Sequence, residues 1–154
     1  MAGSKHPQES RVEMTQLVLP AHTNAIGTIF GGQIMAWIDT AAAICSFRHS
    51  RKMCVTASMD ALNFISPVKQ GDIVILQANV NYTGRSSMEI GVKVTSENSI
   101  TGEKKKTARA YLTFVALDDK GKPVEIAQIL PQNEQEKTWY QEGKERRERR
   151  LKRP

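Results

Sequence analysis

Residues 31–47 read GGQIMAWIDTAAAICSF. After its two glycines this segment is rich in apolar and helix-forming residues, and it predicts a helix from Gly31 to about His49. Five of its side chains recur at the spacing of one helical face: Ile34, Ile38, Ala41, Ala42 and Cys45. Because alanine side chains are short, a sheet can approach this face closely. We therefore predict a long helix that a sheet wraps.

Asp39 is the one formally charged residue between Glu13 and Arg48. Acidic side chains are almost never fully buried unless they are paired, and burying a carboxylate without a partner costs much free energy. An acid kept in so apolar a helix needs a partner, a water-lined cleft or a chemical task. Asp39 is therefore the first candidate catalytic residue.

Segments of β character lie on both sides of the predicted helix. One precedes it and four follow it, separated by turn-like breaks such as Gln70-Gly71-Asp72 and Thr83-Gly84-Arg85. Strands joined by such short links pair antiparallel, since parallel neighbours need a long crossover. The predicted strands cover residues 12–19, 54–64, 73–82, 88–95 and 107–117. The order predicts an α+β fold with an antiparallel sheet of about five strands, and its open edges make a dimer that continues the sheet plausible.

The chain of 154 residues has the length of one domain. We predict a disordered lead-in at residues 1–10, a folded domain at 11–131 and a charged helical tail at 132–154 that is solvated or frayed. The net charge of +6 is shared between tail and domain, so it fits an anionic small molecule at least as well as a nucleic acid.

Targeting signals and metal motifs are not seen in the sequence. The polar start lacks the apolar segment of a secretory signal, and no run reaches the roughly 18 apolar residues of a membrane span. Cys45 and Cys54 have no metal-ligand spacing and are expected to be buried free thiols. The expectation is a cytoplasmic protein.

The loop before the helix contains two further candidates for chemistry. Gly31 and Gly32 leave uncovered N–H groups at a helix N-terminus, which can stabilise the oxyanion of a reacting carbonyl. A tight turn that needs glycine for backbone reasons is the alternative. Asn24 is a neutral partner that could orient water or a carbonyl group, and an Asx turn is its alternative role. No Walker motif is present, since Gln33 and Ile34 follow the last glycine.

The segment from His22 to Asp39, HTNAIGTIFGGQIMAWID, closely resembles the signature of hotdog-fold acyl-CoA thioesterases, in the branch of brain-type cytosolic acyl-CoA hydrolase and its small bacterial relatives. The segment TGRSSM at 83–88 is similar to a second element of that family. The likeness covers roughly residues 11–131. It implies the hotdog fold and hydrolysis of fatty acyl-CoA to a fatty acid and free CoA.

The resemblance also implies roles for individual residues. Asp39 would be the general base or nucleophile and Asn24 its partner, while Gly31 and Gly32 would supply the oxyanion-binding amides. The CoA moiety would lie along three consecutive residues, Arg85, Ser86 and Ser87. Coenzyme A is then a substrate moiety or product, and no cofactor or metal is expected. The family's habit favours self-association as a trimer of dimers.

Helix geometry separates two of these candidates. Gly31 and Asp39 are eight residues apart, so about 12 Å of helix lies between their backbones at ~1.5 Å per residue. One thioester group cannot easily touch both in a single chain. We therefore predict a site shared across a dimer, with Asn24 and the Gly31-Gly32 helix end from one subunit and Asp39 from the other.

Two other functions remain open. A hotdog hydratase or dehydratase acting on acyl thioesters would want a positioned histidine, for which only His22 is a candidate. A non-catalytic acyl-CoA-binding regulator would use the basic tail to contact nucleic acid. We expect binding to neither nucleic acid nor membrane.

Overall fold

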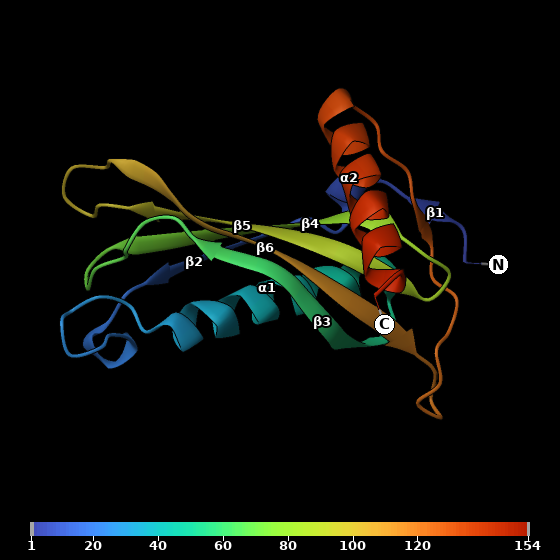
Figure 1. Ribbon diagram of the computed structural model, residues 1–154, viewed down its shortest axis with the longest axis horizontal. Coiled ribbons are helices and arrows are strands. Elements are labelled where there is room, and N and C mark those ends of the chain that lie inside the picture. Colours follow the sequence, from blue (N-terminus) through green and yellow to red (C-terminus); the bar gives the residue numbers. More distant parts are fainter. Residues whose placement is uncertain (1, 154) are drawn as a thin grey trace.

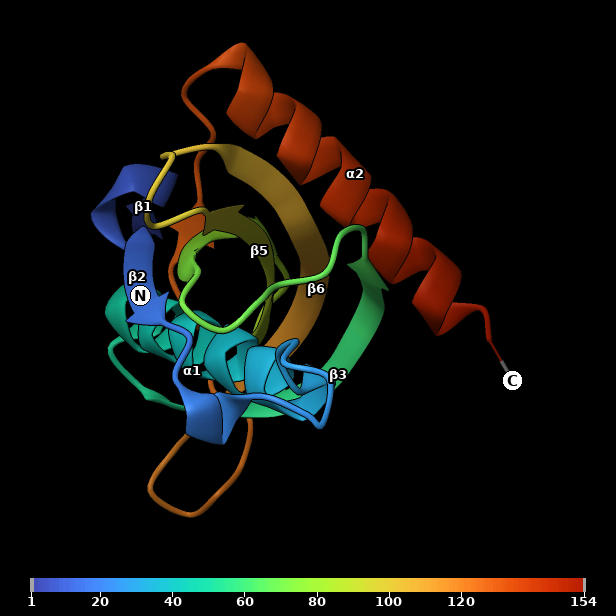
Figure 2. The same ribbon diagram turned by 90° about the vertical axis from the view of Figure 1, so that its left-hand side faces the viewer.

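The computed structural model describes residues 2–153, without the side chain of Ala61. Five antiparallel strands form one sheet in the order β2-β4-β5-β6-β3, and the sheet curls around the long helix α1, Gly31–Ser50 (Figures 1 and 2). The strands are β2 Val12–Leu17, β3 Met53–Phe64, β4 Ile73–Thr83, β5 Ser87–Glu97 and β6 Lys104–Leu117. The predicted wrapped-helix architecture is confirmed.

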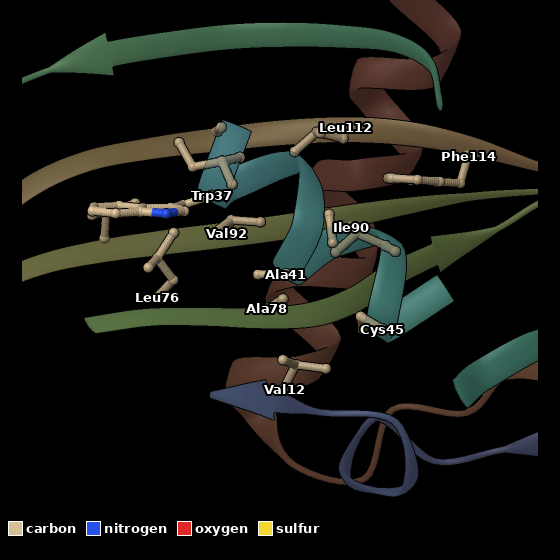
Figure 3. Packing of buried hydrophobic residues seen from close by; sticks show 14 of the residues in the cluster. Val12, Trp37, Ala41, Cys45, Leu76, Ala78, Ile90, Val92, Leu112 and Phe114 are labelled. Atoms are coloured by element: carbon tan, nitrogen blue, oxygen red, sulfur yellow. The ribbon is translucent and has the colours of Figure 1, made fainter. Parts of the chain in front are cut away.

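The core lies between α1 and the concave face of the sheet. The helical face predicted from the sequence is fully buried, and Ala41 and Cys45 point at sheet residues such as Ala78 and Ile90 (Figure 3). Alternate residues of β4 are also buried, as the period of two requires for a strand with one face on the core. The short alanine side chains are therefore the reason why the sheet can close tightly over α1.

The first ten residues differ from the prediction of a disordered lead-in. Ser4–Lys5 forms β1, which pairs in parallel with β7, Gln128–Ile129, and a short 3-10 helix, η1, follows at Pro7–Glu9. The His6 ring also lies 3.0 Å from the Leu130 carbonyl oxygen. These backbone and side-chain contacts order a segment with few apolar residues. Of the first ten residues, Met1 lies outside the described part of the chain.

The tail is helical as predicted, but it is neither frayed nor simply solvated. Helix α2, Glu134–Leu151, lies across the convex face of the sheet (Figure 2). Arg146 donates two hydrogen bonds to the buried Glu89 of β5, at 2.7 and 3.0 Å, and its guanidinium lies 3.6 Å from the centroid of the Tyr111 ring. Arg150 pairs with Asp60 of β3 at 2.8 Å. The charged residues of α2, which led to the prediction of a solvated helix, thus hold it to the sheet.

No helix within residues 2–153 is both long and apolar enough to cross a membrane.

Candidate active site

Asp39 lies midway along α1, and its carboxylate faces strand β3. Thr56 of β3 donates a hydrogen bond from Oγ1 to Asp39 Oδ1 at 2.8 Å. Both residues lie beside the edge of the sheet, because β3 is the last strand in the order of the sheet and pairs with β6. The carboxylate is half-buried and has one oxygen free of protein donors among the described residues. It can therefore face a ligand that approaches from this edge.

Thr56 is a site residue that sequence reasoning missed. It lies 17 positions from Asp39, and it is one of many polar residues in a strand. Its partnership with Asp39 arises only when β3 folds beside α1. The single available signal is that a buried or half-buried acid needs a donor, and that signal does not say which residue supplies it.

The N-terminus of α1 is open. Phe30 is the N-cap residue, and no side chain of the described residues caps the helix. Gly31 and Gly32 are absent from the glycines with positive φ, so the backbone conformation does not require glycine at either position. A Cβ added at Gly31 would come no closer than 3.8 Å to its nearest neighbour, Phe64. At Gly32, by contrast, a Cβ would lie 2.6 Å from the Phe30 ring, so the packing of Phe30 requires glycine there. The space over Gly31, and not that over Gly32, is available to a ligand.

A cavity of about 310 Å³ adjoins this helix end. Its lining is mainly apolar and comes from the loop before α1, the first turn of α1 and the segment after β3: Thr28, Ile29, Gly31, Ile34, Phe64, Ile65, Ser66, Pro67 and Val68. The combination of free N–H groups with an apolar cavity suits a polar carbonyl group attached to an apolar chain.

Asn24 organises the loop that leads to α1. Its Oδ1 accepts the N–H groups of Ile26 and Thr28 at 3.0 and 3.2 Å, and its Nδ2 donates to Thr28 Oγ1 at 2.8 Å. The alternative role of an Asx turn is therefore realised. One hydrogen of the exposed Nδ2 group stays free of these contacts, so the same side chain can still donate to a ligand.

The predicted CoA-binding residues lie far from this helix end. Arg85 and Ser86 form the turn between β4 and β5, and Ser87 begins β5. Strand β4 begins beside the loop that leads to α1, because the N–H group of Val18 in that loop donates to the carbonyl oxygen of Asp72. The other end of β4, at the turn, lies roughly 35 Å from this point at ~3.3 Å per residue. Figure 1 shows the two regions at opposite ends of the molecule.

His22 has a structural task at the entry to α1. Its Nδ1 accepts a hydrogen bond from the N–H group of Leu19 at 3.0 Å. Its ring packs against the Trp37 ring in a T-shaped arrangement, with the centroids 5.0 Å apart. No contact with a carboxylate is present among the described residues. This arrangement does not favour the histidine–carboxylate chemistry of a hydratase.

Two other titratable groups are buried at the far end of α1. Burial lowers the pKa of His49 below its ordinary value, against the opposing effect of the Ala127 carbonyl oxygen that its Nε2 contacts at 2.7 Å. Burial also raises the pKa of the Cys45 thiol to about 12. Burial therefore favours the neutral form of both groups, and Cys45 is not an activated nucleophile.

Apolar side chains remain exposed along α1, β3 and the loop before α1. They surround the edge at which Asp39 and Thr56 lie: Ile26, Phe30, Met35, Phe47, Met53, Val55, Phe64 and Ile65. We call this set the β3-edge surface. Exposed apolar side chains beside an unpaired strand edge are typical of an interface with another chain.

No three His, Cys, Asp or Glu side chains within the described residues come together as a possible metal site.

Comparison with known proteins places these features in a family. The model of the thioesterase superfamily matches residues 26–103. A Bacillus subtilis protein named as an uncharacterized acyl-CoA thioester hydrolase is 44% identical over 146 residues, which is 92% of this chain and 85% of the relative. Mouse acyl-coenzyme A thioesterase 11 is 42% identical over 149 residues, and the match spans 97% of this chain but 25% of the mouse protein.

Solved structures agree with the sequence comparison. The crystal structure of an acyl-CoA hydrolase from Bacillus cereus is 44% identical, with a TM-score of 0.93 over 96% of this chain and 90% of that chain. The acyl-CoA hydrolase of Staphylococcus aureus, solved with butyryl coenzyme A and coenzyme A, is 40% identical with a TM-score of 0.91 over 96% of this chain and 90% of that chain. A hexameric thioesterase from Yersinia pestis is 36% identical, with a TM-score of 0.70 over 75% of this chain and 93% of that chain.

Structures of the S. aureus hydrolase also include three alanine variants, of an asparagine, an aspartate and a threonine. The asparagine and the aspartate are 15 positions apart in that chain, and the aspartate and the threonine are 17 apart. With the family model, the close relatives and the matching fold together, this chain belongs to the thioesterase superfamily, as a hotdog-fold acyl-CoA thioester hydrolase.

Proposed function

We propose that the protein hydrolyses fatty acyl-CoA to a free fatty acid and CoA, with Asp39 as general base or nucleophile. One observation carries this assignment. Asn24, Asp39 and Thr56 stand at the same spacing along this chain as the asparagine, aspartate and threonine that were replaced in the S. aureus hydrolase. In the structure, two of these three residues are joined by the hydrogen bond between Thr56 and Asp39.

The proposed reaction uses each part of the site. The thioester carbonyl oxygen lies against the N–H groups of Gly31 and Gly32, where the helix dipole favours the oxyanion that forms. Asp39 either takes a proton from the attacking water or attacks the carbonyl carbon itself, with water releasing the acid in a second step. The thiol of CoA is the leaving group in both routes. Thr56 holds the carboxylate in one orientation, and Asn24 orients the carbonyl or the water.

The site is shared between two subunits in this proposal. About 12 Å of helix separates Gly31 from Asp39 in one chain, and the Arg85–Ser87 segment lies at the opposite end of the same subunit (Figure 1). A two-fold axis beside α1 and perpendicular to it would set two α1 helices antiparallel. Asp39 and the Arg85 turn of one subunit could then face the Gly31 end of the other, and CoA would extend along Arg85, Ser86 and Ser87.

The β3-edge surface is the interface that this arrangement requires. It is apolar, it contains the unpaired edge of β3, and Asp39 lies next to it. Joining two such edges would continue the sheet across the dimer and cover the exposed side chains. We further propose that three dimers form a hexamer, because related thioesterases are hexameric. A cytoplasmic location stays a prediction, for which the cytosolic hydrolases among the relatives are the support.

The test of the chemistry is the release of free thiol from acyl-CoA esters of increasing chain length. We expect Asp39→Asn to lower kcat by roughly a hundredfold to ten-thousandfold, the usual contribution of a general base. Asp119→Asn, in the exposed turn after β6, is the matched control and should keep full activity. Wild-type turnover by Asp39→Asn would refute the assigned role.

The test of the shared site is complementation. Mixed dimers of Asn24→Ala and Asp39→Ala chains contain one site with both changes and one site with neither. Purified heterodimers should therefore recover up to half of the wild-type activity, whereas each homodimer stays inactive. Heterodimers that remain inactive would show that each site belongs to one chain.

A further inference from the structure

The turn between β4 and β5 carries hydrogen-bond donors that the protein does not use. The carbonyl oxygens of Arg85, Ser86 and Ser87 all accept backbone N–H groups, at 2.8 to 2.9 Å. The N–H groups of Arg85 and Ser86 and the hydroxyl groups of Ser86 and Ser87 meet no acceptor among residues 2–153. A turn with its acceptors satisfied and its donors free is suited to an anion.

A second guanidinium lies against this turn, from an element outside the proposed CoA-binding segment. Arg147 of α2 packs directly on Gly84, so that a Cβ added at Gly84 would lie 1.9 Å from Arg147 Nη1 and 2.9 Å from its Cζ. The hydroxyl oxygen of Ser87 lies 3.0 Å from the same point. The absence of a side chain at Gly84 therefore brings the Arg147 guanidinium close to the Ser87 hydroxyl.

The charge of Arg147 is not neutralised within the described residues. On the same helix, Arg146 pairs with Glu89 and Arg150 pairs with Asp60. Arg147 is also half-buried, yet it forms no ion pair with an acidic side chain of residues 2–153. A half-buried cation next to free N–H and hydroxyl donors makes the surroundings of the turn attractive to a phosphate group.

We propose that Arg147 binds a phosphate of the nucleotide part of CoA, together with the turn from Gly84 to Ser87. The inference rests on the proposed function, in which Arg85, Ser86 and Ser87 lie along CoA. It adds a residue of the C-terminal helix to the substrate site and gives that helix a role in recognising CoA. The planar guanidinium can donate two parallel hydrogen bonds to phosphate oxygens, which a lysine cannot do.

The proposal predicts a defect that depends on the nucleotide. Acyl-CoA and the matching acyl-pantetheine contain the same thioester, but only the CoA ester carries the phosphates. Arg147→Gln should raise KM for acyl-CoA roughly tenfold, the usual effect of one lost charge-assisted hydrogen bond, while kcat for acyl-CoA changes little. The loss in kcat/KM for acyl-pantetheine should be much smaller than that for acyl-CoA.

Three further variants make the test specific. Arg149→Gln removes an equal charge from an exposed position of α2 and should keep the wild-type KM. Arg147→Lys should recover only part of the affinity. Gly84→Ala keeps Arg147 but places a Cβ where the guanidinium lies, and it should raise KM for acyl-CoA as Arg147→Gln does.

The outcomes separate this inference from the function on which it rests. An unchanged KM in Arg147→Gln, or an equal loss on acyl-CoA and acyl-pantetheine, would overturn the role of Arg147. If Arg85→Gln raised KM for acyl-CoA in the same experiment, the CoA site at the turn would stand without Arg147. If the wild type handled acyl-pantetheine as well as acyl-CoA, the turn would have no part in binding the phosphates of CoA.

Discussion

Gly31 has a role that we propose to be chemical and not structural. Its backbone has an ordinary φ, and a Cβ there would make only a normal contact with Phe64. We expect Gly31→Ala to leave the free energy of unfolding unchanged or slightly higher, since alanine suits a helix better. The added methyl group would crowd the N–H groups at the helix end, and kcat should fall roughly tenfold to a hundredfold.

Thermal unfolding and thiol release together check this prediction. Gly102→Ala is the opposite control, because Gly102 has a φ of +76° in an exposed turn with nothing near its missing Cβ. That variant should lose about 1 kcal/mol of stability through backbone strain and keep its activity. A Gly31→Ala enzyme of normal kcat would remove the helix end from the proposed oxyanion site.

Thr56 acts in our proposal through the orientation of Asp39. Thr56→Val keeps the shape of the side chain and removes the hydroxyl that donates to Asp39 at 2.8 Å. We expect kcat to fall several-fold to tenfold, with KM and the melting temperature little changed, because Thr56 lies at the surface of the subunit. Thr56→Ser should restore kcat, whereas a purely structural role would not distinguish valine from serine in this way.

His49 makes stability depend on pH. Burial lowers its pKa in the folded protein, so below about pH 6.5 the unfolded chain takes up a proton that the folded chain resists. The contribution of His49 to stability is therefore fully present above pH 6.5 and is lost as the pH falls through the folded pKa, at up to about 1.4 kcal/mol per pH unit. Urea unfolding between pH 7.5 and 5 should show this slope in the wild type. His49→Gln should reduce it, and an identical slope in both proteins would contradict the assignment.

Helix α2 shows what an ion pair does at the scale of an element. Burial alone would lower the pKa of Arg146, but its hydrogen bonds to Glu89 and the charge of that residue raise the pKa above its usual value. The side chains of Arg146 and Glu89 are 15% and 5% exposed. We expect Glu89→Gln to cost about 3 kcal/mol, because it leaves a largely buried cation with only the half-exposed Glu142, 4.0 Å away, as a counter-charge.

Denaturant unfolding measures this cost, and an exposed pair on the same helix supplies the control. Lys137 and Glu134 form an ion pair with 60% and 94% of their side chains exposed. Lys137→Gln should therefore change the free energy of unfolding by less than about 0.5 kcal/mol. Equal effects of the two substitutions would mean that the Arg146 pair does not hold α2 to the sheet.

Elements also differ in how far the sequence predicts them. Helix α1 and the strands could be predicted, because their buried residues recur with the period of the element. The docking of α2 could not, because its contacts with the sheet are made by charged residues that are usually solvated. The pairing of β1 with β7 joins segments more than 120 residues apart and has no local pattern. Asp39 and the two glycines were predicted at one site, but Thr56 emerged only from the fold.

At the scale of the whole molecule, one subunit does not bring its candidate residues together. Helix α1 begins at one end of the molecule and the turn between β4 and β5 lies at the other end (Figure 1), while Asp39 lies midway along α1. The β3-edge surface lies beside Asp39, and Val55 at 45% exposure is part of it. If two subunits join at this surface, a substitution that prevents their association must also abolish the activity.

Val55→Glu tests this coupling, because it places a charge on the apolar edge strand without touching Asp39, Asn24 or Gly31. We expect light scattering to show dissociation to folded monomers, and thiol release to fall to the level of Asp39→Asn. Thr15→Glu adds the same charge to the exposed side of β2, at the opposite edge of the sheet, and should change neither quantity.

If Thr15→Glu dissociated the protein and Val55→Glu did not, the dimer would form through β2. The active site would then have to be completed by another route, because β2 lies at the far edge of the sheet from β3, the strand beside Asp39.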